Sequence, residues 1–160
     1  MRNSYSFDDV LLVPKYSDIE SRKEVNIGNK LGEDIDLGLP LISSPMDTVT
    51  EVEMLLKMDY FGGLGVLHRY NTAEKQGNLA IACKERGAKN IGAAIGMTGD
   101  YMERAHRLVE SGVNVLCVDV AHGHHKMMEV CLKTLKDKFP STHVMAGNVA
   151  TLEAFDALAQ

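Results

Sequence analysis

The chain has 160 residues, of which 45% are hydrophobic and 24% are charged, the balance of one ordinary globular domain. Its formal net charge of -5 argues against nucleic acid or a membrane surface as the main partner, and no apolar run reaches the roughly 18–20 residues of a membrane span. The N-terminus lacks the apolar core of a signal peptide, so we expect a cytoplasmic protein.

The first 38 residues predict an irregular lead-in segment with short extended pieces. Residues 8–14 contain an apolar run that Pro14 closes, and residues 33–38 look like a turn. Regular alternation begins at Leu39. We therefore expect a lead-in over residues 1–38 and a domain over residues 39–160.

Apolar segments alternate with helical patterns from residue 39 onward. The predicted strands are 39–46, 62–69, 90–96, 113–121 and 143–149, and the predicted helices are 49–60, 72–86, 100–111, 125–139 and one that opens at Thr151. Thr48 or Thr50 is expected to cap the first helix. This order predicts right-handed strand–helix–strand units and a parallel sheet.

Two folds fit this order, a doubly wound open sheet and the first half of an eight-stranded barrel. Periodicity alone does not choose between them, although the GxGxxG signature of a dinucleotide-binding open sheet is missing. In both folds ligands bind beyond the C-terminal ends of the strands. The polar segments at these ends are 43–47, 68–70, 96–98, 119–125 and 147–148, and we predict that they share one rim.

Each polar strand end has more than one interpretation. Asp119 either accepts hydrogen bonds from two ribose hydroxyls or caps a helix or pairs with a cation. Asn148 either holds the edge of a heterocycle or satisfies loop backbone. The segment from His68 through Arg69 to Tyr70 either contacts a phosphate or a base, or is an exposed polar strand end.

The histidine and cysteine residues predict no metal centre. His122, His124 and His125 have no carboxylate or cysteine partner at ligand spacing, so a loop in which Gly123 lets the backbone approach a ligand closely is the better account. The three cysteines, whose spacing fits neither a disulfide framework nor a zinc site, are predicted to be structural; they are Cys83, Cys117 and Cys131.

Six segments, in order, resemble the IMP dehydrogenase/GMP reductase family; they are 5–14, 40–51, 62–69, 92–96, 118–124 and 146–151. The resemblance implies an α/β fold of the TIM (β/α)8 barrel type, of which this chain supplies roughly the first half, about five strands. On the purine side it implies binding roles for Ser44, Met46 and Asn148. On the dinucleotide side it implies binding roles for Asp119, Ala121, His122 and Arg69, with Asp119 on the ribose next to the nicotinamide of NAD.

The resemblance also implies an activity in guanine nucleotide biosynthesis. In the family a thiolate attacks carbon 2 of the IMP base, hydride passes to NAD and water releases XMP. The residues of segments 43–45 and 122–124 match the dehydrogenase motifs better than the reductase motifs. GMP reductase, which converts GMP and NADPH to IMP and ammonia, is the first alternative, and a non-catalytic half-barrel that binds nucleotides or assembles with a partner is the second.

The sequence departs from the family pattern at two places, and both departures bear on the activity expected of this chain. Only about 20 residues connect Arg69 to Asn90, so the regulatory CBS-domain pair that many family dehydrogenases insert here is absent. The family's catalytic Cys loop follows the sixth strand, so we expect no catalytic residue in this chain and an inactive chain on its own. The complete family enzyme is expected to use potassium, with ligands outside this chain, and to form a homo-tetramer; a complementary C-terminal half is the other expected partner.

Overall fold

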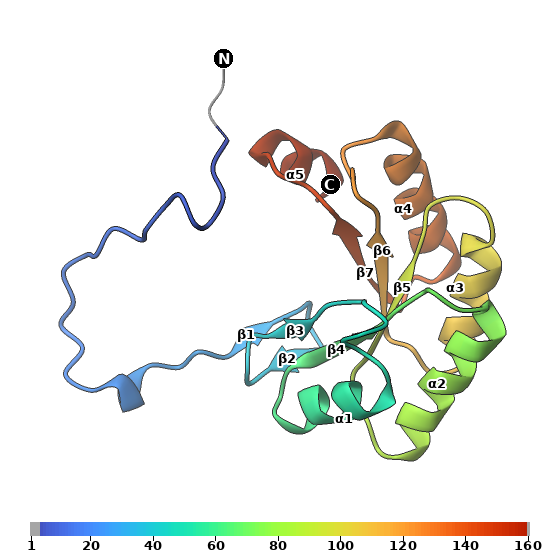
Figure 1. The fold of residues 1–160 in the computed structure, drawn as a ribbon, viewed down its shortest axis with the longest axis horizontal. Coiled ribbons are helices and arrows are strands. Elements are labelled where there is room, and N and C mark those ends of the chain that lie inside the picture. Colours follow the sequence, from blue (N-terminus) through green and yellow to red (C-terminus); the bar gives the residue numbers. More distant parts are fainter. Residues whose placement is uncertain (1–3, 160) are drawn as a thin grey trace.

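Five parallel strands in chain order form the main sheet of the computed structural model, which describes residues 4–159 (Figure 1). The strands are β3 (Ile42–Ser43), β4 (Leu64–Leu67), β5 (Ile91–Ile95), β6 (Val115–Asp119) and β7 (His143–Gly147). The helices are α1 (Val52–Tyr60), α2 (Ala73–Glu85), α3 (Tyr101–Glu110), α4 (Lys126–Lys138) and α5 (Leu152–Leu158). The predicted alternation of strands and helices is therefore confirmed.

The helices pack on one face of the sheet. Strand residues such as Leu67, Ile95 and Leu116 form a single buried cluster with helix residues such as Leu108 and Leu135. Because every crossover steps in the same direction, each right-handed unit places its helix on the same side. A doubly wound sheet reverses its strand order and carries helices on both faces, so this arrangement is that of a curled, barrel-like sheet.

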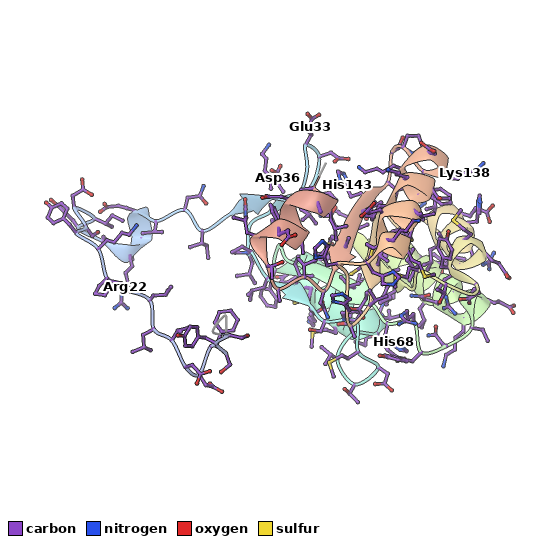
Figure 2. The ribbon with its side chains drawn as sticks, turned by 90° about the horizontal axis from the view of Figure 1, so that it is seen from above. Arg22, Glu33, Asp36, His68, Lys138 and His143 are labelled. Atoms are coloured by element: carbon purple, nitrogen blue, oxygen red, sulfur yellow. The ribbon has the colours of Figure 1, made fainter. Side chains whose placement is uncertain are left out.

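The opposite face of the sheet is covered near its N-terminal edge by a short hairpin. Strands β1 (Asn29–Lys30) and β2 (Asp36–Leu37) pair antiparallel, and Ile35 and Leu37 are buried against Val66 and Val115. A hydrogen bond between the Asp34 carboxylate and the His143 ring fixes the hairpin to the first residue of β7. Figure 2 shows Asp36 and His143 at the end of the sheet opposite His68.

This hairpin corrects the prediction for residues 33–38. The turn occupies residues 31–34, and Asp36 and Leu37 belong to a strand. Two-residue strands are too short to carry a periodic pattern, so the sequence gives no strand signal here. From residue 4 to the hairpin, the chain is an extended arm with one turn of 3-10 helix, η1 (Arg22–Glu24), and it runs away from the sheet (Figure 1). Its exposed apolar side chains include Phe7, Leu11, Leu12, Val13 and Tyr16.

The first strand and helix are shorter than predicted, and the predicted cap is wrong. Helix α1 begins at Val52, and its N-cap is Glu51, which makes no side-chain capping bond. The Thr50 hydroxyl instead lies 2.7 Å from the carbonyl oxygen of Ser44, to which it donates. Thr50 therefore fixes the turn between β3 and α1 rather than the helix terminus.

The cysteines lie in apolar surroundings. Cys83 and Cys131 are buried and Cys117 is partly buried, and all three are free thiols. Burial raises the pKa of each thiol to about 11, and the negative charge of Asp119 adds to this effect at Cys117. The predicted structural role fits these surroundings, because a thiol is nucleophilic only as its thiolate.

We expect all three thiols of the folded chain to resist thiol reagents at pH 8, where a pKa of about 11 leaves about one thiol in a thousand ionised. Because the unfolded thiols ionise first as the pH rises, the free energy of unfolding should fall between about pH 9 and 11. Ellman's reagent, with and without denaturant, measures the reactivity. A cysteine that reacts in the folded chain as fast as in the denatured chain would contradict this expectation.

Within residues 4–159, no helix combines the length and the apolar composition needed to cross a bilayer.

Candidate functional site

The C-terminal ends of the five strands lie along one edge of the sheet, because the strands are parallel and adjacent. This edge, here called the rim, carries the predicted polar segments. Asp119 ends β6 and pairs in register with Gly147, the last residue of β7. Ser44 follows β3 and Arg69 lies two residues after β4. The rim is therefore the only place where the sheet presents all of these residues within the described chain.

Asp119 presents its carboxylate at the end of β6. No ion pair or hydrogen bond to this carboxylate is seen among residues 4–159, and the side chain is partly exposed. The N-cap of the following helix is His125 rather than Asp119. Neither the capping interpretation nor the ion-pair interpretation of Asp119 thus describes the structure, and the carboxylate remains able to accept hydrogen bonds from a ligand.

Arg69 reaches across the end of β5 to the Asp119 backbone. Its Nη2 donates to the carbonyl oxygen of Asp119 at 3.3 Å. The guanidinium passes over Gly96, where a side-chain Cβ would lie 3.7 Å from Nη1. Its Nε is buried without a hydrogen-bond partner in the described chain. A positive group is consequently held beside the end of β6, and it links two predicted dinucleotide-side residues.

The loop between β6 and α4 is bound to the end of β7. The Gly123 N–H donates to the carbonyl oxygen of Asn148 at 2.7 Å, and the Asn148 N–H donates to that of Val120 at 2.7 Å. The close approach predicted for Gly123 therefore exists, but it is to neighbouring backbone and not to an open ligand space. Ala121 and His122 are exposed on this loop.

The Asn148 side chain is exposed at the rim. The side-chain amide of Asn148 makes no hydrogen bond to other residues in the described part of the chain. Only the backbone N–H and carbonyl of Asn148 bond to the loop between β6 and α4. The interpretation in which the side chain satisfies loop backbone is therefore wrong. The amide is left with both donor and acceptor capacity facing outward.

Ser44 and Met46 lie on the far side of the rim. Both are exposed, and their backbone carbonyls accept hydrogen bonds from Thr50. Strands β4 and β5 separate them from β6. The structure thus places Ser44 and Met46 on the same edge as Asp119 and Asn148 without bringing the two pairs into contact.

His68 is a structural residue rather than part of an exposed strand end. It is only 3% exposed. Its Nδ1 accepts a hydrogen bond from the Tyr70 N–H at 3.2 Å, and its Nε2 lies 3.2 Å from a Glu51 carboxylate oxygen. Because Nδ1 is an acceptor, the ring proton sits on Nε2 and points to Glu51. Tyr70 stacks on His68 and keeps its own ring exposed.

Of the three histidines that follow β6, His125 has a structural role at the start of α4. The Nδ1 of His125 accepts a hydrogen bond from the Met127 N–H at 3.1 Å and so caps α4. Among residues 4–159, no group of three or more His, Cys, Asp or Glu side chains is placed to hold a metal ion.

A buried polar network, which sequence reasoning missed, supports the rim from behind. The Gln76 amide of α2 donates to the carbonyl oxygens of Ala94 at 2.9 Å and Leu67 at 3.4 Å, near the ends of β5 and β4. Arg104 of α3 donates to the Gln76 side-chain oxygen at 2.8 Å and also pairs with Asp100. A polar residue on the core-facing side of each helix could have indicated this network. Gln76 shares the buried face of α2 with Ala80 and Cys83. Arg104 shares the buried face of α3 with Ala105 and Leu108.

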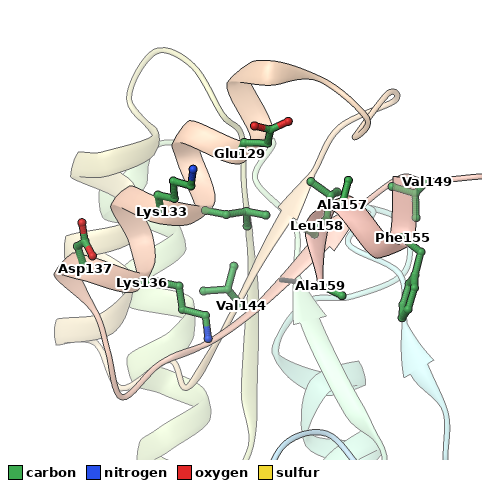
Figure 3. Close-up of a pocket in the computed structure, with 12 residues that line it drawn as sticks. Glu129, Lys133, Lys136, Asp137, Val144, Val149, Phe155, Ala157, Leu158 and Ala159 are labelled. Atoms are coloured by element: carbon green, nitrogen blue, oxygen red, sulfur yellow. The ribbon is translucent and has the colours of Figure 1, made fainter. Parts of the chain in front are cut away.

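A hollow of about 680 Å³ lies between α4, β7 and α5, and its lining extends to Val149, the residue after Asn148 (Figure 3). Its walls include Leu132 and Val144, and Lys133 and Asp137 project from α4. It opens on the helix-covered face of the sheet, where α5 packs. The polar side chains among its described lining residues, those of Glu129, Lys133, Lys136 and Asp137, are exposed, so the rim is the better candidate for chemistry.

Comparison with known proteins gives a consistent result. The family model described as "IMP dehydrogenase / GMP reductase domain" matches residues 4–160. The chain is 35% identical to an inosine-5'-monophosphate dehydrogenase of Cryptosporidium parvum, over 93% of this chain and 47% of that protein. It is 29% identical to one from Borreliella burgdorferi, over 96% of this chain and 50% of that protein. It is 31% identical to a GMP reductase of Buchnera aphidicola, over 95% of this chain and 45% of that protein. The chain thus spans about half the length of these relatives.

Proposed function

Because the chain belongs to the IMP dehydrogenase/GMP reductase family, we propose that it forms the first half of a TIM (β/α)8 barrel that oxidises IMP to XMP with NAD and water. The single observation that carries the proposal is the rim. It presents the Asp119 carboxylate and the Asn148 side-chain amide on neighbouring strand ends, and neither group has a hydrogen-bond partner among residues 4–159. A ribose and a purine base need such groups within one site.

The purine nucleotide would lie against Ser44, Met46 and Asn148, and the dinucleotide against Asp119, Ala121, His122 and Arg69. The donor set fits these ligands: an ionised carboxylate with free lone pairs can accept from both hydroxyls of one ribose. Asn148 can donate to and accept from the edge of the base. Arg69 holds the carbonyl end of β6, which keeps the backbone of Asp119 in place.

When bound, the nicotinamide ring supplies the acceptor for the hydride. The residues of this chain bind and orient the two ligands and do not form the covalent intermediate. Cys83, Cys117 and Cys131 do not fit the role of nucleophile, since burial raises each pKa to about 11. The catalytic Cys of the family is therefore assigned to none of them.

A GMP reductase that uses NADPH is the second candidate. The observation that favours it is the relative from Buchnera aphidicola, whose 31% identity lies between the 35% and 29% of the two dehydrogenases. Identity alone thus does not separate the two activities. A non-catalytic half-barrel that binds nucleotides or assembles with a partner is the other alternative. We further propose a cytoplasmic homo-tetramer in guanine nucleotide biosynthesis, with potassium bound outside this chain.

The test is an assay of the protein made from the complete reading frame that contains this chain. We expect turnover of IMP with NAD, followed as NADH and XMP formation, and none of GMP with NADPH. Turnover only with GMP and NADPH would transfer the assignment to the reductase. Binding of IMP without turnover in either mixture would support the non-catalytic module.

A further inference from the structure

The pairing of β6 with β7 continues past the last strand residues. The regular ladder ends where Asp119 pairs with Gly147. Beyond it, the Asn148 N–H donates to the carbonyl oxygen of Val120 and the Gly123 N–H donates to that of Asn148, each at 2.7 Å. The loop that carries Ala121 and His122 and the strand end that carries Asn148 are thereby bound to each other directly.

Only glycine fits at position 123. A Cβ on Gly123 would lie 2.9 Å from the Asn148 carbonyl oxygen and 3.1 Å from the Gly147 carbonyl carbon. Both are backbone atoms, which cannot rotate away as a flexible side chain would. The backbone φ of Gly123 is not in the left-handed region, so the requirement is one of space and not of conformation.

The geometry points to a role for Gly123 as a positioning residue. We propose that it locks the β6–α4 loop to the Asn148 strand end, so that the dinucleotide side and the purine side of the site move as one unit. The assignment of a dinucleotide side and a purine side rests on the proposed function. The connection between the loop and the strand end rests only on the backbone hydrogen bonds of Gly123 and Asn148. Gly123 has no side chain to offer either ligand, and the atoms nearest to an added Cβ are backbone atoms of Gly147 and Asn148.

Amide hydrogen exchange of the complete protein tests the lock without any ligand. We compare wild type, Gly123→Ala and the matched control Gly38→Ala, where a Cβ meets nothing within 4 Å and φ is not left-handed. Gly123→Ala should speed hydrogen exchange of the Asn148 backbone amide by about tenfold or more, because the added methyl group pushes the β6–α4 loop away from the Asn148 strand end. The control should leave that amide unchanged. An Asn148 amide as protected in Gly123→Ala as in wild type would overturn the proposal.

A second measurement needs no variant and covers the case in which Gly123→Ala does not fold. In the wild-type chain the Gly123 and Asn148 amides should open with the same equilibrium constant, because one event releases both. Amides of the buried strands, such as those of Ile95 and Val118, give the reference for global unfolding. Opening constants that differ by more than about tenfold between Gly123 and Asn148 would show that the loops open independently.

Titration with IMP and with NAD then tests the consequence for binding in the complete protein. Gly123→Ala should weaken both ligands by about tenfold, whereas Gly38→Ala should change neither by more than about twofold. Loss of NAD affinity with unchanged IMP affinity would contradict the coupling. If wild-type protein binds neither ligand, the proposed function fails, and the exchange measurements alone decide on the lock.

Discussion

Replacement of Arg104 by Leu should lower the free energy of unfolding by about 3 kcal/mol. Arg104 is 7% exposed, and its guanidinium donates to Gln76, to Asp100 and to the carbonyl oxygen of Asn71. A leucine fills much of the same space but leaves the buried Gln76 oxygen and the partly buried Asn71 carbonyl without this donor. A buried acceptor that loses its partner costs more than the bond itself contributes. Urea unfolding followed by circular dichroism measures the change.

The matched control is Arg107→Leu on the same helix. Arg107 makes one long hydrogen bond to Asn78, at 3.3 Å and exposed to solvent, so its loss should cost less than about 1 kcal/mol. Equal losses at Arg104 and Arg107 would show that the buried network does not stabilise the chain. The network also matters for the rim, because Gln76 ties the ends of β4 and β5 to α2.

Replacement of Asp119 by Ala should weaken binding of NAD to the complete protein by about 30-fold or more and change the affinity for IMP by less than about threefold. Each hydrogen bond between a ribose hydroxyl and an ionised carboxylate contributes about 1.5–3 kcal/mol. The Asp119 carboxylate has no partner in residues 4–159 that would compete for these bonds. Isothermal titration with each ligand separately gives the two affinities.

Asp137→Ala is the control for the loss of one negative charge. Asp137 is an exposed carboxylate on α4, beside the hollow and away from the rim, so its replacement should leave both affinities within about twofold. An equal loss of IMP and NAD affinity in Asp119→Ala would count against a ribose role for that residue.

Much of the sheet could be predicted because its strands are continuous apolar runs. The segment 113–121 contains β6 (Val115–Asp119), and the segment 125–139 contains α4 (Lys126–Lys138). The predicted strand 39–46 is the exception, because only Ile42 and Ser43 pair with β4. Pro40 and Pro45 flank this pair, and proline has no N–H to donate to a neighbouring strand.

The choice between a doubly wound sheet and a barrel-like sheet could not be made from periodicity. Both folds bury both faces of their strands, so both produce the same apolar runs. The difference lies in the strand order and in the side of the sheet that each helix covers, which are properties of the packed chain. The strand order without reversal and the helices on one face decide it.

The supporting contacts of the site could not be predicted, because they join residues far apart in the sequence. Arg69 and Asp119 are 50 positions apart, and Asp34 and His143 are 109 apart. Their residue types alone indicate only exposed charge. The strand ends themselves were predictable, since the C-terminal ends of parallel strands lie on one edge wherever the sheet curls.

We expect a purine nucleotide and a dinucleotide to meet at the C-terminal rim of this sheet. A crystal structure of the complete protein with IMP and NAD bound is the decisive test. IMP should lie against Ser44 and Asn148, with a ribose of NAD on the Asp119 carboxylate. Ligands found instead at the hairpin end of the sheet, or in the hollow between α4 and α5, would contradict it.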